Sequence, residues 1–163
     1  MTPTTPVGTT SPEQTEAFGA AIAQVLRPDD VVLLDGDVGV GKSVLVRGML
    51  RELGWSGPVL SPTFTLLNEY ELDSTPLSRV VHGDLYRLES GAELDGLGLD
   101  DAFDGATALV VEWGGVAPQI WGPNVLSVRL EYSGPNERTL TVSGIGRFAQ
   151  GTDAAAVLEG WRH

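Results

Sequence analysis

The chain of 163 residues contains no cysteine, and this absence excludes a disulfide framework, thiolate metal sites and thiol catalysis. Lysine is nearly absent too: Lys42 is the only one, so nine of the 10 basic residues are arginines. Acidic residues number 22 and give the chain a net charge of −12. An acidic surface repels phosphate backbones and anionic membranes, so we do not expect this chain to bind nucleic acid or lipid by itself.

Long apolar runs are also missing from the sequence. No stretch approaches the roughly 20 residues of a membrane-spanning helix, and the first residues lack the basic start and apolar stretch of a signal peptide. The length suits one domain, and the hydrophobic fraction of 42% is that of a globular protein. We therefore expect a cytoplasmic protein with no membrane contact. Residues 1–10 are expected to be a flexible tail, and residues 11–163 a single domain.

Along the chain, segments with helical patterns alternate with segments with extended patterns. Apolar residues at helical spacing predict helices over 11–26, 43–53, 92–99 and 153–161. Apolar or alternating runs predict strands over 31–34, 64–72, 79–81 and 108–111, and an antiparallel hairpin of 124–132 with 138–145. The runs at 31–34 and 108–111 have no polar alternation, which is typical of central strands covered on both faces of a parallel sheet. The expected fold class is α/β.

The strongest motif lies between the first of these strands and the following helix. Residues 36–43 have the sequence Gly-Asp-Val-Gly-Val-Gly-Lys-Ser and match G-x-x-x-x-G-K-[S/T] without a mismatch. The glycines allow backbone N–H groups to approach phosphates, and the helix start adds its positive end. Lys42 is expected to reach the outer phosphates, and the Ser43 hydroxyl to ligate Mg²⁺. A glycine-rich surface turn is the competing interpretation, but the strand before it, the helix after it and the position of the only lysine favour nucleotide binding.

Two acids follow apolar strands and are candidates for the metal and the attacking water. Asp84 ends the run from 79, and Glu112 ends the run from 108, so a parallel sheet would bring both to the crevice beside the phosphate loop. Solvated strand-end carboxylates are the alternative. Three further residues have open interpretations: His82 as a catalytic or a core histidine, Arg47 as a functional or a solvated arginine, and Thr63 in a nucleotide-sensing loop or a turn.

Together these segments resemble one protein family. Residues 36–43 are followed in order by Ser-Pro-Thr-Phe-Thr-Leu at 61–66, His-Gly-Asp-Leu-Tyr-Arg at 82–87, Glu-Leu-Asp-Gly-Leu-Gly at 93–98 and Glu-Trp at 112–113. The order and spacing resemble the TsaE family, small bacterial ATPases needed to make threonylcarbamoyladenosine in tRNA. The resemblance extends from about Ser11 to Ile145. With the patterns above, it predicts a three-layer P-loop NTPase with a mainly parallel central sheet and a C-terminal antiparallel hairpin.

The resemblance implies slow hydrolysis of MgATP and two partners, TsaD and TsaB, which perform the transfer to adenosine and provide the main tRNA contacts. It implies catalytic roles for Lys42, Asp84 and Glu112, and metal ligands from Ser43, Asp84 and Glu112. The predicted ATP- or ADP-binding residues are Gly36, Asp37, Val38, Gly39, Val40, Gly41, Lys42, Ser43, Val44, Thr63 and Trp113.

The sequence departs from the family pattern at two places, and two other functions stay open. Ser43 replaces the usual threonine, and residues 114–116 are Gly-Gly-Val where many relatives carry an acid and an arginine, so a charge-stabilising arginine must come from Arg87, Arg47 or a partner. A small-molecule kinase would need an arginine-rich lid, which is not visible. A nucleotide-gated interaction module without significant turnover would share every site residue.

Overall fold

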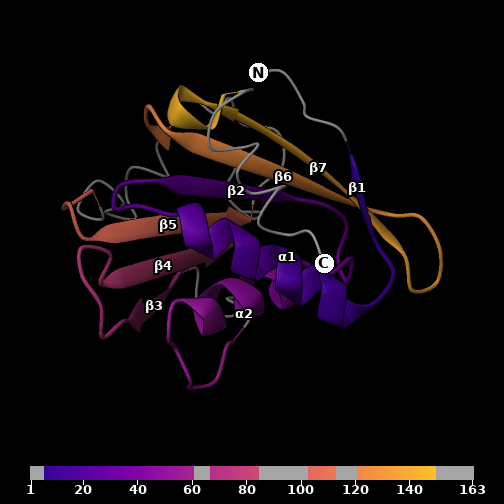
Figure 1. Ribbon diagram of the computed structural model, residues 1–163, viewed down its shortest axis with the longest axis horizontal. Coiled ribbons are helices and arrows are strands. Elements are labelled where there is room, and N and C mark those ends of the chain that lie inside the picture. The colour runs from indigo at the N-terminus through magenta and orange to yellow at the C-terminus, as the bar shows by residue number, and fades with distance from the viewer. Residues whose placement is uncertain (1–5, 61–66, 85–102, 113–120, 150–163) are drawn as a thin grey trace.

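A computed structural model describes residues 6–60, 67–84, 103–112 and 121–149. These residues form one mixed sheet of seven strands in the order β1-β7-β6-β2-β5-β4-β3 (Figure 1). The strands are β1 (Val7–Thr9), β2 (Val31–Asp35), β3 (Leu67–Glu71), β4 (Arg79–Asp84), β5 (Thr107–Glu112), β6 (Val125–Tyr132) and β7 (Arg138–Ile145). The helices are α1 (Pro12–Val25), α2 (Lys42–Glu52) and a short 3₁₀ turn, η3 (Gly146–Phe148).

The four central strands run parallel, and the outer strands run antiparallel. β6, β2, β5 and β4 are joined by parallel pairings, whereas β3 pairs with β4, β7 with β6 and β1 with β7 in the antiparallel sense. The α/β class and the C-terminal hairpin are therefore confirmed. The sheet as a whole is mixed, and it is parallel only in its centre.

The amino-terminal segment differs from the prediction. Residues 7–9 were expected to belong to a flexible tail, but they form β1 and pair with β7, with Val7 opposite Leu140. Thr9 is buried, and its hydroxyl lies 2.9 Å from that of Thr15 in α1. The prediction of a flexible tail is therefore wrong for residues 7–9. An edge strand of three residues is too short for its pattern to be recognised in a Thr- and Pro-rich sequence.

Both helices begin and end within one residue of their predicted bounds. The Ser11 hydroxyl caps α1 by accepting the backbone N–H of Gln14 at 3.2 Å, and Pro12 occupies the first helical position. α2 ends at Glu52, and Gly54 follows two residues later. The φ angle of Gly54 is 97°, the left-handed conformation that is common just after a helix C-terminus. Neither helix in the described part of the chain has the length and apolarity needed to cross a membrane.

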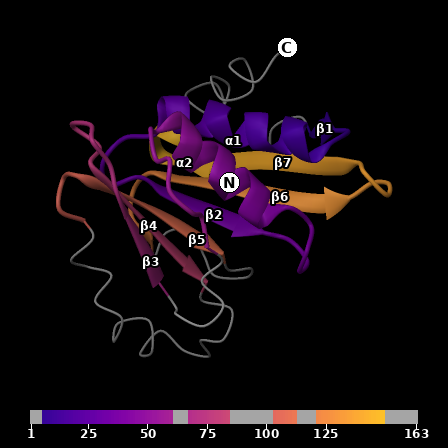
Figure 2. The same cartoon turned by 90° about the horizontal axis from the view of Figure 1, so that it is seen from below.

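α1 and α2 lie side by side on one face of the sheet (Figures 1 and 2). Their backbones approach closely because glycines face each other at the crossing. A Cβ atom on Gly19 would clash with the Leu45 carbonyl of α2, and one on Gly48 would clash with the Glu16 carbonyl of α1. Apolar side chains of both helices, among them Phe18 and Leu50, are fully buried against the sheet and form the main core.

The other face of the sheet carries a second apolar cluster. It consists of alternate strand residues with one aromatic side chain: Val31, Leu33, Val81, Leu109, Val111, Val125 and Trp121. In the described residues both helices lie on the first face, so the predicted three-layer arrangement stays a prediction. The predicted helices over 92–99 and 153–161, and residues 64–66 of the expected strand over 64–72, lie outside the described residues.

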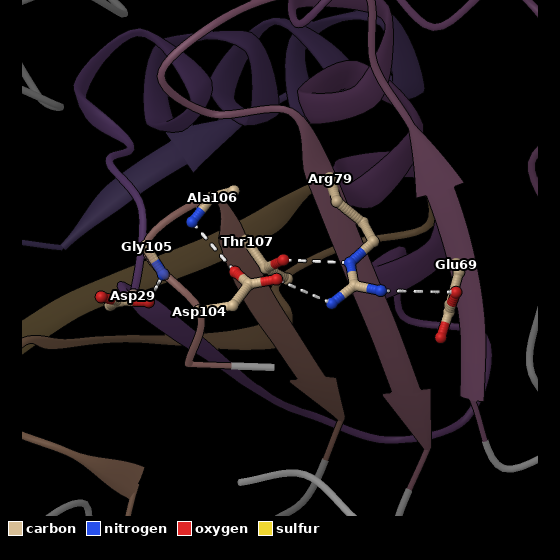
Figure 3. Close-up of polar contacts among 7 residues, drawn as sticks. All are labelled: Asp29, Glu69, Arg79, Asp104, Gly105, Ala106 and Thr107. Atoms are coloured by element: carbon tan, nitrogen blue, oxygen red, sulfur yellow. Dashed lines mark hydrogen bonds and ion pairs between the residues drawn. The ribbon is translucent and has the colours of Figure 1, made fainter. Parts of the chain in front are cut away.

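Polar contacts join the middle of β3 to the starts of β4 and β5, at the end of β4 and β5 that lies away from the phosphate loop (Figure 3). The Arg79 side chain donates to the Thr107 hydroxyl at 3.0 Å and to the Asp104 carboxylate at 3.1 Å, and it lies 3.8 Å from Glu69. The Ala106 backbone N–H, more than the guanidinium, holds the pKa of Asp104 below its ordinary value of 3.8. This cluster fixes the register of the strands that carry the candidate acids at their far ends.

A buried ion pair ties the turn before β2 to the end of the hairpin. Asp30 is 1% exposed, and it pairs with Arg147 of η3 and accepts the Arg27 backbone N–H at 2.7 Å. Arg147 also donates to the Val25 carbonyl at the end of α1 at 2.6 Å. Burial raises the pKa of Asp30 above 3.8, although the guanidinium acts in the opposite direction.

Candidate nucleotide-binding cleft

The phosphate loop joins the end of β2 to the start of α2, as the motif predicts. Gly39 and Gly41 have φ angles of 82° and 120°, in the region that glycine adopts without strain. At Gly36 the requirement is space, because a Cβ atom would lie 2.7 Å from the Leu130 carbonyl oxygen of β6. The loop therefore needs glycine at 39 and 41 for its backbone conformation and at 36 for its close approach to β6.

Lys42 is the first residue of α2 and projects into the cleft beside the loop. Its Nζ donates to the Gly36 carbonyl at 2.7 Å, which closes the loop on itself. Ser43 follows and is exposed, and Val44 is half-buried in the same first turn. Lys42 thus brings a cation to the cleft at the positive end of a helix, which is a suitable environment for an anion.

Asp84 and Glu112 meet across neighbouring strands. They are partners in the parallel register of β4 and β5, and Glu112 is in turn the partner of Leu34 in β2. Alternation places both acids on the sheet face covered by the helices, because Val80 and Val110 of the same strands belong to the main core. The prediction that strand ends would bring these acids to the phosphate loop agrees with this arrangement.

A cleft of about 800 Å³ contains Lys42 and both acids. Its walls come from the ends of β2, β4, β5 and β6 and from the phosphate loop: Leu34, Asp35, Gly36, Asp37, Val38, Lys42, Asp84, Glu112, Arg129, Leu130, Glu131 and Tyr132. Val40 differs from its neighbours in the motif, since its side chain is 1% exposed and belongs to the main core. Its contribution to phosphate binding can therefore come only from its backbone.

His82 lies behind Glu112 in the protein interior. Its side chain is 1% exposed, and Nε2 is 3.8 Å from the Glu112 carboxylate. Within the described residues neither ring nitrogen has a hydrogen-bond partner. The position is that of a buried neighbour of the candidate acid, and His82 is not among the residues that line the cleft.

The structure adds residues that the sequence did not single out and places others elsewhere. Arg129 and Tyr132 of β6 line the cleft, and the Arg129 Nε is 3.2 Å from the Asp35 carboxylate. Arg47, considered above as a source of positive charge, pairs with Glu16 of α1 at 3.7 Å and does not line the cleft. The parallel pairing of β6 with β2, which sets Arg129 opposite Asp35, cannot be read from an alternating strand pattern.

Several predicted residues lie outside the described part of the chain. They are Thr63, Arg87 and Trp113, together with residues 114–116. Among the described residues, no group of three or more His, Asp or Glu side chains gathers closely enough to hold a metal ion. A site of one hydroxyl and two carboxylates suits Mg²⁺, which keeps several waters and takes further oxygens from phosphates.

Comparison with known proteins assigns the chain to a family. The family model described as "Threonylcarbamoyl adenosine biosynthesis protein TsaE" matches residues 9–140. The chain belongs to the TsaE family. It is 36% identical over 138 residues to the tRNA threonylcarbamoyladenosine biosynthesis protein TsaE of Bacillus subtilis (strain 168), covering 85% of this chain and 84% of that protein. A TsaE of Mycobacterium leprae (strain TN) is 37% identical over 126 residues, or 73% of this chain and 77% of that protein.

A solved structure supports the TsaE-family fold. The crystal structure of YdiB from Bacillus subtilis matches with a TM-score of 0.73 and 26% identity, covering 99% of this chain and 96% of that chain. The resemblance to TsaE that the motifs carry is therefore confirmed, and so is the α/β class. The roles of individual side chains in this TsaE-family cleft stay predictions.

Proposed function

We propose that this chain is a P-loop ATPase that binds and slowly hydrolyses MgATP and supports threonylcarbamoyl modification of adenosine in tRNA. The observation that carries the proposal is the cleft in which Lys42, at the start of α2, faces Asp84 and Glu112 at two neighbouring strand ends. A P-loop alone indicates only a nucleotide. A P-loop with two acids beside it also has the groups that hydrolysis needs.

In this proposal each part of the cleft has a separate task. The loop amides and Lys42 bind the β- and γ-phosphates, and the Ser43 hydroxyl with Asp84 and Glu112 holds Mg²⁺. Mg²⁺, when bound, would offset the negative charge of the phosphate oxygens. Glu112 is mostly buried, at 7% exposure, and at the cleft wall it can also accept a hydrogen bond from a water molecule and orient it.

The remaining parts of the proposal follow from the family. TsaD and TsaB type subunits would carry out the transfer and contact the tRNA, and ATP hydrolysis would support their repeated turnover in the cytoplasm. The net charge of −12 fits a subunit that leaves tRNA to its partners. The predicted third layer of the P-loop fold would cover the second apolar cluster around Leu33 and Leu109.

The first test is calorimetric titration of the purified chain with MgATP. Lys42→Ala should weaken binding about tenfold to a hundredfold, because a hydrogen-bonded charge at the phosphates is lost. Arg47→Met is the matched control: it removes a cation one turn further along α2, where the side chain pairs with Glu16 and lies outside the cleft. Equal affinity of wild type and Lys42→Ala would contradict the assignment of the phosphate loop.

The second test measures ATP hydrolysis alone and with a TsaD–TsaB pair. We expect slow turnover alone, and a change of rate with repeated tRNA modification when the pair is present. Fast turnover that the pair does not change, or phosphorylation of a metabolite, would instead favour an independent ATPase or a kinase.

A further inference from the structure

Two carbonyl groups of the phosphate loop are bound by side chains from the turn end of the β6–β7 hairpin. The Tyr132 hydroxyl donates to the Val38 carbonyl at 3.3 Å, and the Arg138 Nε donates to the Val40 carbonyl at 2.8 Å. Tyr132 and Arg138 are partners in the hairpin register, and the guanidinium lies 4.4 Å from the centre of the Tyr132 ring. One cross-strand pair therefore holds two positions of the loop.

Arg138 is itself fixed from the other side. Its Nη1 donates to the Glu137 carbonyl at 2.8 Å and to the Gly134 carbonyl at 3.3 Å, both in the turn of the hairpin. The five donors of a guanidinium have a rigid planar arrangement, so bonds to the turn determine where Nε points. The loop is thus held by a side chain whose orientation does not depend on the loop.

The direction of these carbonyls determines the direction of the loop amides. A trans peptide is planar, so its C=O and N–H point in opposite directions. The Val38 carbonyl belongs to the same peptide as the Gly39 N–H, and the Val40 carbonyl to the same peptide as the Gly41 N–H. Holding the carbonyls toward the hairpin turns both N–H groups away from it. Within the described residues, neither of these N–H groups donates to a protein acceptor.

We propose that Tyr132 and Arg138 are positioning residues that orient the Gly39 and Gly41 amides toward the phosphates of the bound nucleotide. This inference rests on the proposed function. Glycines at 36, 39 and 41 leave the free loop many conformations, and two side-chain donors on its outer carbonyls reduce that freedom before the nucleotide arrives. In this proposal Tyr132 and Arg138 contribute to affinity through the orientation of the loop backbone.

The test uses Tyr132→Phe and Arg138→Met, with MgADP affinity and the NMR shifts of the Gly39 and Gly41 amides as readouts. Tyr132→Phe keeps the ring and removes one hydroxyl, so we expect the MgADP Kd to rise about three- to tenfold and the shift of the Gly39 amide on MgADP addition to fall. Arg138→Met should raise the Kd similarly and diminish the Gly41 shift. Arg51→Met is the control, because Arg51 also donates to two backbone carbonyls, of Trp55 and Gly57, but at the far end of α2.

The outcomes separate this inference from the proposed function. If wild type binds no MgADP or MgATP, the proposed function is wrong. If wild type binds and Tyr132→Phe matches it in Kd and in the Gly39 shift, the positioning role is overturned. If Arg138→Met does not fold, Tyr132→Phe decides alone, since loss of one half-exposed hydroxyl leaves the core unchanged. An equal loss in Arg51→Met would also overturn the inference, because the effect would then be one of general stability.

Discussion

Strand register brings Glu112 and Asp84 together at the cleft. Each is the last residue of a parallel strand, and pairing of β4 with β5 sets them opposite one another. Glu112 is also the partner of Leu34 in β2, the strand that leads into the phosphate loop, so it lies one strand nearer to that loop than Asp84. This difference in position gives the two acids different expected roles, with Glu112 the better placed to act on water.

Replacement of Glu112 should affect turnover more than binding. We expect Glu112→Gln to lower the rate of ATP hydrolysis about a hundredfold, as loss of a residue that orients and activates water typically does, while the Kd for MgATP changes less than about fivefold. Single-turnover hydrolysis and calorimetry measure the two quantities separately. Glu131→Gln is the control, because Glu131 lines the same cleft from β6 and has no assigned role. Equal losses of binding and turnover would make Glu112 a structural residue.

At the scale of elements, what the sequence predicts is the type of each segment, and what it misses is how segments approach one another. Helical spacing, the Ser11 cap and Gly54 placed α1 and α2 correctly, and the P-loop consensus predicted the loop between β2 and α2. Gly48 appears in the sequence only as a poor helix former. The position requires glycine because the α1 backbone packs directly against it, and this contact depends on tertiary packing. Arg129 was missed for the same reason, because it enters the cleft through the pairing of β6 with β2.

The ion pair of Asp30 with Arg147 links α1, the start of β2 and the end of the hairpin, and its removal should be costly. Asp30 is 1% exposed, so Arg147→Met would leave a buried carboxylate without its cation. We expect the free energy of unfolding to fall by about 3 kcal/mol at pH 7. Arg129→Met is the control, because its ion pair with Asp35 is exposed and should contribute less than about 1 kcal/mol.

The same variant should show a pH dependence of known sign. Burial raises the pKa of Asp30 above 3.8 in the folded chain, and loss of the guanidinium should raise it further. A carboxyl with a raised folded pKa favours folding below its unfolded pKa, and this contribution is lost as the pH rises through the folded pKa. The difference in free energy of unfolding between wild type and Arg147→Met, measured by urea unfolding, should therefore become smaller as the pH falls from 7 to 5. A deficit that grows toward acid pH would contradict this account.

At the scale of the whole molecule, the positive charges are few and mostly engaged. Lys42 faces the cleft, and the described arginines apart from Arg27 contact carboxylates or backbone carbonyls: Arg47, Arg51, Arg79, Arg129, Arg138 and Arg147. No basic surface in the described part of the chain could therefore follow a phosphate backbone. Binding to tRNA by this chain alone would also have to overcome a net charge of −12.

We therefore expect the isolated chain to bind tRNA with a Kd weaker than about 100 μM at physiological salt, near the weak limit of non-specific binding. Fluorescence anisotropy of labelled tRNA over a salt series, with and without MgATP, measures this directly. Addition of a TsaD–TsaB pair should restore binding, since the proposed function assigns the tRNA contacts to those subunits. A Kd near 1 μM with a steep salt dependence for the chain alone would contradict the assignment of the tRNA contacts to the partner subunits.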